Sequence, residues 1–176
     1  LVGEAISTND SAIREIFGRG SILFCTANSA FNKSSLKGNY FFDEDFIYSE
    51  DLELVSRVSK YNKWVYVPEM KVYYSARNTF KSYAFQMYLY GKWKMYYEFL
   101  TKEYRLIDFI PSGIIIISLF FSLMFRSFVP LLILPIFSFL ESLFIFILKR
   151  PGLKVSSLLF LAWFIKNLFW SIGTFN

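Results

Sequence analysis

The sequence predicts two parts of different kinds: a mixed α/β region over residues 1–105 and a region of membrane-spanning helices over 106–176. Charge distribution is the first observation behind this division. Residues 1–105 hold 14 Lys or Arg and 12 Asp or Glu, whereas residues 106–176 hold only 5 and 2. Hydropathy is the second, because the chain beyond Leu106 is apolar in segments close to the roughly 17–25 residues that a membrane-spanning helix needs.

Three apolar segments follow Leu106, and they run over 107–125, 128–148 and 155–172. They leave no polar face for water, so they fit poorly as buried helices of a soluble core. The basic connection at 149–154 lies in the cytoplasm by the positive-inside rule. Counting back through the spans predicts a multi-pass protein of the cell membrane, with residues 1–105 cytoplasmic and the tail at 174–176 outside.

The composition excludes several kinds of active site. The sequence contains no histidine, which removes Ser-His and Cys-His nucleophile pairs and every histidine-bound metal site. A single cysteine rules out an intramolecular disulfide framework. Any acid–base chemistry carried by these residues therefore falls to carboxylates, Lys, Tyr or water.

An acidic cluster occupies residues 43–53, where six of eleven side chains are carboxylates. Ser49 is a good N-cap residue, and the apolar stripe over 54–58 has helical spacing, so a helix is predicted to begin after Ser49. Acidic residues in a first turn suit the helix dipole. Glu50 and Asp51 are therefore either ordinary helix-start residues or a catalytic pair, and the pattern leaves both interpretations open.

The α/β assignment of residues 1–105 depends on short apolar runs on either side of this helix. Runs rich in β-branched and aromatic residues predict strands at 21–30, 64–67 and 70–74, with Pro68 ending the second of these. A small helix is predicted to start at 33–36. Strands that alternate with helices in this way are typical of a mixed α/β domain.

Short motifs follow one another in a definite order between residues 28 and 94. They are Asn28-Ser-Ala-Phe-Asn-Lys-Ser-Ser-Leu36, Phe42-Asp43-Glu44, Glu50-Asp51-Leu52-Glu53-Leu54 with Arg57, Val67-Pro68, Tyr73-Tyr74-Ser-Ala-Arg77, and Gln86-Met-Tyr-Leu-Tyr90-Gly91-Lys92-Trp93-Lys94. Their order and spacing resemble the second half of family 2 glycosyltransferases, which are inverting enzymes of the GT-A fold. The later motifs resemble the membrane-bound succinoglycan-biosynthesis type.

The resemblance implies a domain organisation and a reaction. Residues 1–78 would be the C-terminal half of the α/β catalytic GT-A domain, 79–105 an amphipathic interfacial segment, and 106–176 a three-helix transmembrane region. Such enzymes move a sugar from a nucleotide-activated donor to a hydroxyl of a lipid-linked or polysaccharide acceptor. The chain would be the C-terminal portion of a longer enzyme and inactive by itself.

The resemblance also implies catalytic roles for the acidic cluster. Asp51 would be the general base that deprotonates the acceptor hydroxyl, and Glu50 would orient or support Asp51. Asp43 and Glu44 would shape the acceptor side of the site.

Four residues further along the chain would bind substrate. Arg77 or Lys92 would meet the donor diphosphate. Gln86 and Trp93 match an element that closes over the active site in related membrane enzymes, with Trp93 as a face on which the acceptor sugar stacks. The alternative for this element is that it only anchors the protein at the membrane interface.

A metal site within this chain is not expected. Tyr74 stands where many family members have a histidine, and Asp43-Glu-Asp45 has the spacing of a metal-binding Asp-x-Asp but lies in the later Phe-Asp-Glu motif. A divalent cation, Mg²⁺ or Mn²⁺, is expected to be bound mainly by the N-terminal half of the family domain, which this sequence does not contain.

The basic and aromatic stretch at 71–105 indicates which molecules the protein binds. Seven Lys or Arg against two Glu, with interleaved aromatic residues, are typical of a segment lying among lipid headgroups. Nucleic acid is the rival partner, and the adjoining spans argue against it. The expected partners are a nucleotide-sugar donor, a lipid-linked or glycan acceptor and membrane lipids. The alternative function is a non-catalytic three-span membrane protein whose cytoplasmic region binds partners or lipid.

Overall fold

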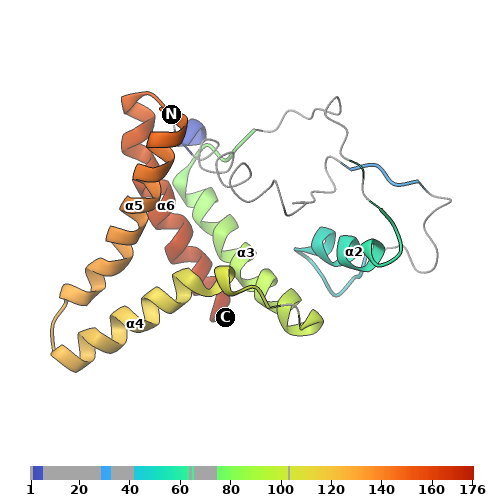
Figure 1. Cartoon of the computed structure of the whole chain (residues 1–176), viewed down its shortest axis with the longest axis horizontal. Coiled ribbons are helices and arrows are strands. Elements are labelled where there is room, and N and C mark those ends of the chain that lie inside the picture. Colours follow the sequence, from blue (N-terminus) through green and yellow to red (C-terminus); the bar gives the residue numbers. More distant parts are fainter. Residues whose placement is uncertain (1, 6–28, 33–41, 64, 66–74, 103) are drawn as a thin grey trace.

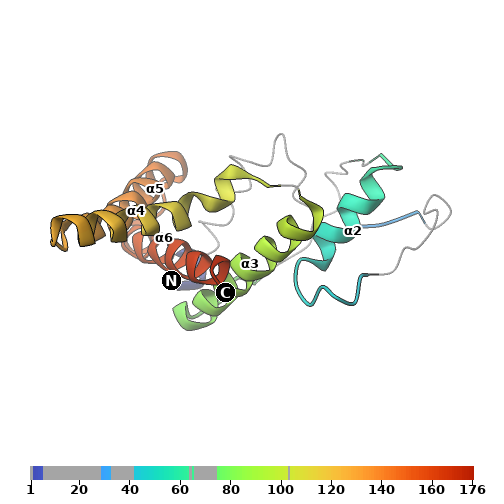
Figure 2. The same ribbon diagram turned by 90° about the horizontal axis from the view of Figure 1, so that it is seen from below.

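The protein is predominantly helical. A computed structural model describes residues 2–5, 29–32, 42–63, 65, 75–102 and 104–176. After a helical turn at residues 2–5, the elements in chain order are α2 (Glu50–Ser59), α3 (Phe80–Thr101), η3 (Leu106–Phe109), α4 (Ile110–Phe125), η4 (Val129–Leu132), α5 (Ile133–Lys149) and α6 (Leu153–Thr174). Helix α2 lies on the far side of α3 from α4, α5 and α6 (Figures 1 and 2).

The predicted α/β fold of the GT-A type is wrong, because the described residues contain no β-strand. Of the predicted strand at 64–67 only Val65 is described, and it is irregular and 81% exposed. The predicted strand at 70–74, most of that at 21–30 and the predicted helix at 33–36 lie outside the described residues. A short β-branched or aromatic run becomes a strand only beside a second strand that takes up its backbone hydrogen bonds. Val65 pairs with no such strand in the described part of the chain.

The three apolar segments form the helices that the sequence predicts. Within the described residues, three stretches are long and apolar enough to cross a membrane, namely Leu106–Phe125, Val129–Lys149 and Lys154–Thr174. Each bound lies within two residues of the predicted one. Pro111 is in the first turn of α4 and Pro130 in the first turn of η4, where a missing backbone N–H costs no helical hydrogen bond.

Several of the residues that these helices bury are polar, while many of their large apolar side chains face outward. The residues that α4 buries are Ser112 and Ser118, whereas its Leu123 is 80% exposed. Helix α6 likewise buries Asn167 and Ser171 completely. Polar groups that face other helices and apolar groups that face outward suit a lipid environment. Composition, length and burial together indicate a multi-pass membrane protein.

Helices α3 and α6 pack tightly through two glycines. A Cβ atom at Gly91 would lie 2.2 Å from the carbonyl oxygen of Trp170, and one at Gly173 would lie 2.1 Å from that of Tyr88. Near the start of α3, the buried residues Tyr83, Met87 and Ala162 form the core of the same interface. The two helices therefore run alongside each other in the same direction, and α3 is fixed to the apolar region.

Helix α5 packs along α6 in the opposite direction. Ile145 contacts Leu159 and Trp163 in one apolar cluster. Two turns away, Asn167 Nδ2 of α6 donates to Ser138 Oγ (3.1 Å) and to Glu141 Oε2 (2.5 Å) of α5. Buried polar contacts of this kind hold apolar helices together where burial of apolar surface gives no net driving force.

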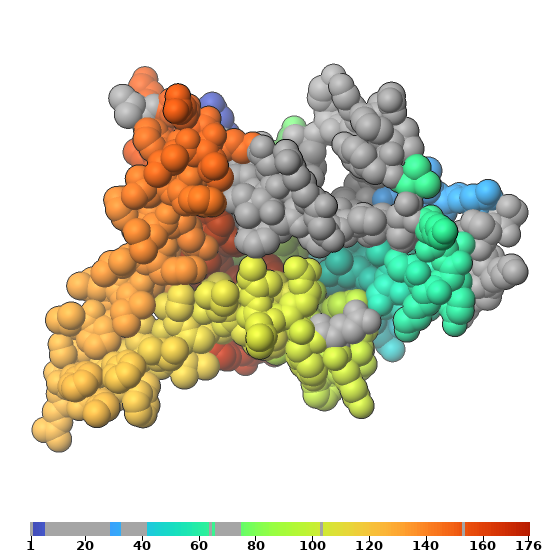
Figure 3. Space-filling view, viewed as in Figure 1, coloured from blue at the N-terminus to red at the C-terminus, as the bar shows by residue number. Residues whose placement is uncertain are grey.

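The beginning of α4 lies at the C-terminal end of α6. Trp170 Nε1 donates to the carbonyl oxygen of Asp108 (3.0 Å), and the hydroxyls of Ser112 and Thr174 are 2.7 Å apart. From there α4 leads away from α6, and α5 returns toward the start of α6 (Figure 1). In the space-filling view, α4 and α5 meet in a projection at one corner of the molecule (Figure 3).

Candidate functional site

The predicted catalytic pair lies in the first turn of α2. Ser49 is the N-cap residue of α2, as predicted, but it has a left-handed backbone (φ 64°, ψ 15°) and its side chain makes no cap hydrogen bond. Its carbonyl oxygen instead accepts from the Glu53 N–H (3.1 Å) and begins the helix. A hydroxyl cap needs an extended backbone at the N-cap residue, which Ser49 does not have. The predicted apolar stripe is confirmed, since Leu54, Val55 and Val58 are buried.

Asp51 has an environment suited to a proton acceptor. Its side chain is half-buried, and Oδ1 accepts a hydrogen bond from the backbone N–H of Leu52 (2.8 Å). Burial raises the pKa of the Asp51 carboxyl above its ordinary value, and the charge of Glu50 raises it further, while the Leu52 N–H works in the opposite direction. Asp51 is thus more basic than a solvated aspartate, which is the direction that general-base chemistry at neutral pH requires.

Asp43 and Glu44 are exposed and lie in a tight turn before α2. Asp43 Oδ1 accepts from the backbone N–H of Asp45 (3.0 Å), and its carbonyl oxygen accepts from the N–H of Phe46 (3.1 Å). Phe46 is only 6% exposed and packs against Tyr96 of α3, with ring centroids 5.4 Å apart. The turn therefore fixes the acidic segment to the C-terminal half of α3.

Trp93 lies close to the same segment. Its ring is 6.3 Å from that of Tyr48, which precedes Glu50 by two residues, and 5.5 Å from that of Tyr96. The contact with Tyr48 brings the predicted stacking residue to the N-terminal end of α2. Trp93 remains half-exposed, so part of its ring is open to a ligand.

Three other predicted substrate-binding residues lie elsewhere. Arg77 is exposed in the segment before α3, and Gln86 Nε2 donates to the Tyr90 hydroxyl (2.8 Å) one turn further along the same helix. Lys92 is half-buried beside the crossing of α3 and α6. No interaction found among the described residues joins Arg77, Gln86 or Lys92 to Asp51. The structure thus gathers Glu50, Asp51 and Trp93 in one region but not these three residues.

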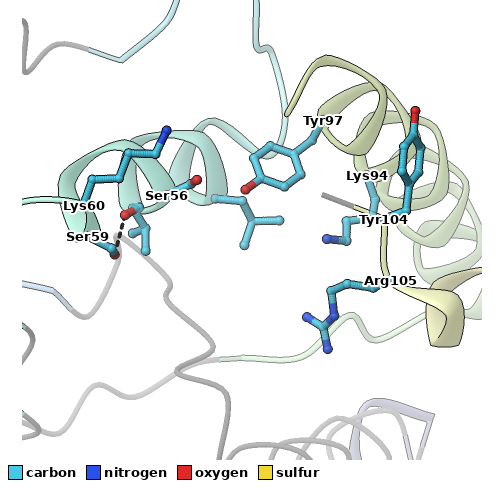
Figure 4. A pocket seen from close by; sticks show the side chains of 9 residues that line it. Ser56, Ser59, Lys60, Lys94, Tyr97, Tyr104 and Arg105 are labelled. Carbon is cyan, nitrogen blue, oxygen red and sulfur yellow. Dashed lines mark hydrogen bonds between the residues drawn. The ribbon is translucent and has the colours of Figure 1, made fainter. Parts of the chain in front are cut away.

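A cleft of about 550 Å³ separates α2 from the C-terminal end of α3. Lys94, Tyr97 and Arg105 extend toward α2 from the side of α3 (Figure 4), and Ser56 and Lys60 line the cleft on the side of α2. Among the described residues, its lining consists of Leu52, Val55, Ser56, Ser59, Lys60, Lys94, Tyr97, Tyr104 and Arg105. These lining residues include three cations and no carboxylate, so this part of the cleft favours an anionic ligand.

Behind the cleft, two acids hold Lys94. Lys94 Nζ lies 3.3 Å from Glu98 Oε1 and 3.6 Å from Asp108 Oδ2, and Arg105 Nε is 3.9 Å from the same Asp108 oxygen. Glu98 is completely buried. Burial raises the pKa of the Glu98 carboxyl, and the neighbouring Asp108 carboxyl raises it further, whereas Lys94 lowers it.

The cluster of Lys94, Glu98, Arg105 and Asp108 was not predicted from the sequence, although two of its ion pairs have the spacing of neighbours on a helix. Lys94 and Glu98 are four residues apart, and Arg105 and Asp108 are three apart. Such pairs are common on solvated helix faces and worth little there. Only the structure shows that Glu98 is buried and that Asp108 joins the pair.

A metal centre is not formed by the part of the chain that the structure describes. Among those residues, no three His, Cys, Asp or Glu side chains are grouped closely enough to hold a metal ion. Binding of Mg²⁺ or Mn²⁺ by residues beyond this chain therefore stays a prediction.

Comparison of the chain with protein-family models, with curated protein sequences and with solved structures found no significant match. The family resemblance therefore depends on the motifs in the sequence alone.

Proposed function

We propose that the chain works as part of a membrane-bound inverting glycosyltransferase, which transfers a sugar from a nucleotide-activated donor to a hydroxyl of a lipid-linked or polysaccharide acceptor at the cytoplasmic face. The observation that carries the proposal is the environment of Asp51, a half-buried carboxyl of raised pKa in the first turn of a helix. The order of the sequence motifs and the three apolar helices support it. The proposal concerns the activity and the site residues, since the described residues do not form the α/β fold of that family.

In the proposed reaction, Asp51 takes the proton of the acceptor hydroxyl as its oxygen attacks the anomeric carbon of the donor. The bond from that carbon to the donor diphosphate breaks, and the nucleotide diphosphate leaves with the electron pair. The Leu52 N–H holds Oδ1 of Asp51, so Oδ2 is the oxygen that receives the proton. Glu50 contributes by raising the pKa of Asp51 through its charge. A divalent cation held by other residues would neutralise the leaving diphosphate.

The test is sugar transfer by the protein expressed from its complete gene, in isolated membranes, with Asp51→Asn compared with the wild type. Asp45→Asn is the matched control, because Asp45 belongs to the same acidic cluster but is exposed. Loss of a general base should slow transfer by about 10²–10⁴-fold. We expect this loss for Asp51→Asn and little change for Asp45→Asn, at equal amounts of membrane-inserted protein. Equal activity of the two variants would refute the role of Asp51.

The second candidate is a non-catalytic membrane protein whose cytoplasmic region binds a partner or lipid. The observation that favours it is the cleft between α2 and α3. Its charged lining residues, within the described part of the chain, are the cations Lys60, Lys94 and Arg105, and Asp51 is not among the lining residues. Absence of transfer from a panel of nucleotide sugars, together with binding of an anion in this cleft, would support this candidate over the first.

A further inference from the structure

The cleft between α2 and α3 has the composition of an anion site. Lys94 and Arg105 converge on it from one side and Lys60 lines the other, while Ser56 offers a hydroxyl donor (Figure 4). Arg and Lys side chains with hydroxyl groups are the usual partners of phosphate oxygens. The site adjoins Leu106, where the first apolar helix begins, so both dissolved anions and lipid headgroups have access to it.

Lys94 is engaged by acids that lie behind the cleft. Its side chain is 12% exposed and contacts Glu98 and Asp108 at 3.3 and 3.6 Å. Apart from the ion pair of Oε1 with Lys94, both carboxyl oxygens of Glu98 are buried without a hydrogen-bond partner among the described residues. A buried carboxylate in that state is costly, and adding a proton removes most of the cost.

The charge balance of the cleft therefore depends on Glu98. With Glu98 ionised, Glu98 and Asp108 together offset the charges of Lys94 and Arg105. With Glu98 protonated, Lys94 keeps only Asp108 as an ionised neighbour, and the cleft gains one unit of positive charge. Lys60, on the opposite wall, adds its charge in either state.

We propose that this cleft binds a phosphate group through Lys94 and Arg105, and that protonation of Glu98 releases Lys94 for that binding. The phosphate belongs either to a dissolved anion or to a lipid headgroup, since both present the same chemistry. The inference does not depend on sugar transfer, because none of the residues involved belongs to the proposed catalytic pair.

Proton uptake and anion binding are linked in this site. Because Glu98 must be protonated when the anion binds, affinity should increase as the pH falls, by up to about tenfold per pH unit above the pKa of Glu98. The pKa of Glu98 is raised by burial, so this range extends to higher pH than that of a solvated glutamate.

The experiment measures binding of inorganic sulfate to the full chain in phosphatidylcholine nanodiscs by calorimetry, at about pH 6 and about pH 8. Sulfate keeps a constant charge over this range, so any change in affinity reports the protein, and inorganic phosphate is titrated in parallel. We expect tighter sulfate binding at the lower pH. Glu98→Gln should bind sulfate equally tightly at both pH values, because its side chain is neutral throughout.

Lys94→Met tests the anion contact, and Lys81→Met is its matched control, because Lys81 is exposed in the first turn of α3 and does not line the cleft. We expect Lys94→Met to lose about tenfold or more in affinity and Lys81→Met to bind as the wild type. Circular dichroism and gel filtration show which variants are folded. If Glu98→Gln does not fold, the pH dependence of the wild type and the loss in Lys94→Met still decide the proposal.

Sulfate affinity that is independent of pH in the wild type, or unchanged in Lys94→Met, would overturn the proposal. Nanodiscs that contain phosphatidic acid identify the source of the phosphate. Sulfate binding that is weaker in these discs than in discs given the same negative charge by oleate assigns the site to a lipid headgroup, and equal binding in the two kinds of disc assigns it to a dissolved anion.

Discussion

Among individual residues, Asp51 and Glu98 share an environment that favours a protonated carboxyl. Burial raises the pKa of both groups from ordinary values of 3.8 and 4.5. The folded state therefore holds these protons more tightly than the unfolded chain does. Each group lowers the free energy of unfolding as the pH rises from its unfolded pKa through its raised folded pKa, and above that window the loss is complete. Both carboxylates are thus destabilising at neutral pH.

Asp51→Asn should therefore make the protein more stable while it removes activity. Asn keeps an oxygen that accepts from the Leu52 N–H but carries no charge to bury. We expect Asp51→Asn to have a higher thermal unfolding midpoint than the wild type at neutral pH. We also expect its midpoint to change less than that of the wild type between about pH 4 and pH 7. Circular dichroism melts of the detergent-solubilised protein measure both, with Asp45→Asn as the control that changes neither. A lower midpoint for Asp51→Asn at neutral pH would contradict the assigned environment.

The sequence predicted where the acidic pair lies but not how it is held. A run of acids before a helical stripe predicts a helix start, and α2 begins at Glu50 as expected. The left-handed backbone of Ser49 and the contact between Tyr48 and Trp93 depend on how the segment docks on α3. Burial of Glu98 likewise results from tertiary packing, which local spacing does not encode.

Among the elements, the apolar helices were predictable and the strands were not. A run of about twenty apolar residues has few alternatives to a membrane helix, because each backbone polar group must be satisfied within the segment. A four- or five-residue run such as 64–67 instead needs a partner strand, and its pattern does not show whether one exists. The packing of α3 on α6 could not be predicted from the sequence either. It depends on two glycines, and the residues that each of them contacts are about eighty positions away in the chain.

Gly91 is the most sensitive point of that packing. A methyl group there would lie 2.2 Å from the Trp170 carbonyl oxygen, so α3 and α6 would have to separate. We expect Gly91→Ala to cost about 1–3 kcal/mol of stability, the usual range for overpacking. Gly113→Ala is the matched control, because Gly113 is also helical but has nothing within 4 Å of its Cβ position. That variant should be neutral or up to about 1 kcal/mol more stable, since Ala favours a helix over Gly.

Thermal unfolding of the two glycine variants in the same detergent provides the comparison. A lower midpoint for Gly91→Ala alone is the expected result. Equal midpoints would show that α3 is not packed against α6 at this position, and that it lies apart from the apolar helices as a purely interfacial segment would.

For the whole molecule, the structure and the predicted topology disagree on one point. The first apolar helix begins where the third one ends, because Asp108 and Ser112 are hydrogen-bonded to Trp170 and Thr174. Three spans that alternate in direction would separate these two ends by the thickness of the bilayer, about 30 Å. If α6 crosses the membrane, the connection at 149–154 lies on the opposite side from both ends. Residues 1–105 and the connection at 149–154 then do not share the cytoplasm, as the charge rule had predicted.

Single cysteines decide between these arrangements. With Cys25→Ser as background, we expect Lys102→Cys and Asn176→Cys to react with a membrane-impermeant maleimide from one side of sealed vesicles, and Gly152→Cys from the other. All three positions are exposed, so a difference in labelling reports sidedness rather than burial. The opposite grouping, with positions 102 and 152 labelled together and 176 apart, would establish three alternating crossings. It would also show that the contact between Ser112 and Thr174 does not form in the membrane. The first grouping would instead show that α5 and α6 are the two helices that cross the membrane. The chain then has to enter α5 from the side on which α6 ends, so α4 both begins and ends on that side.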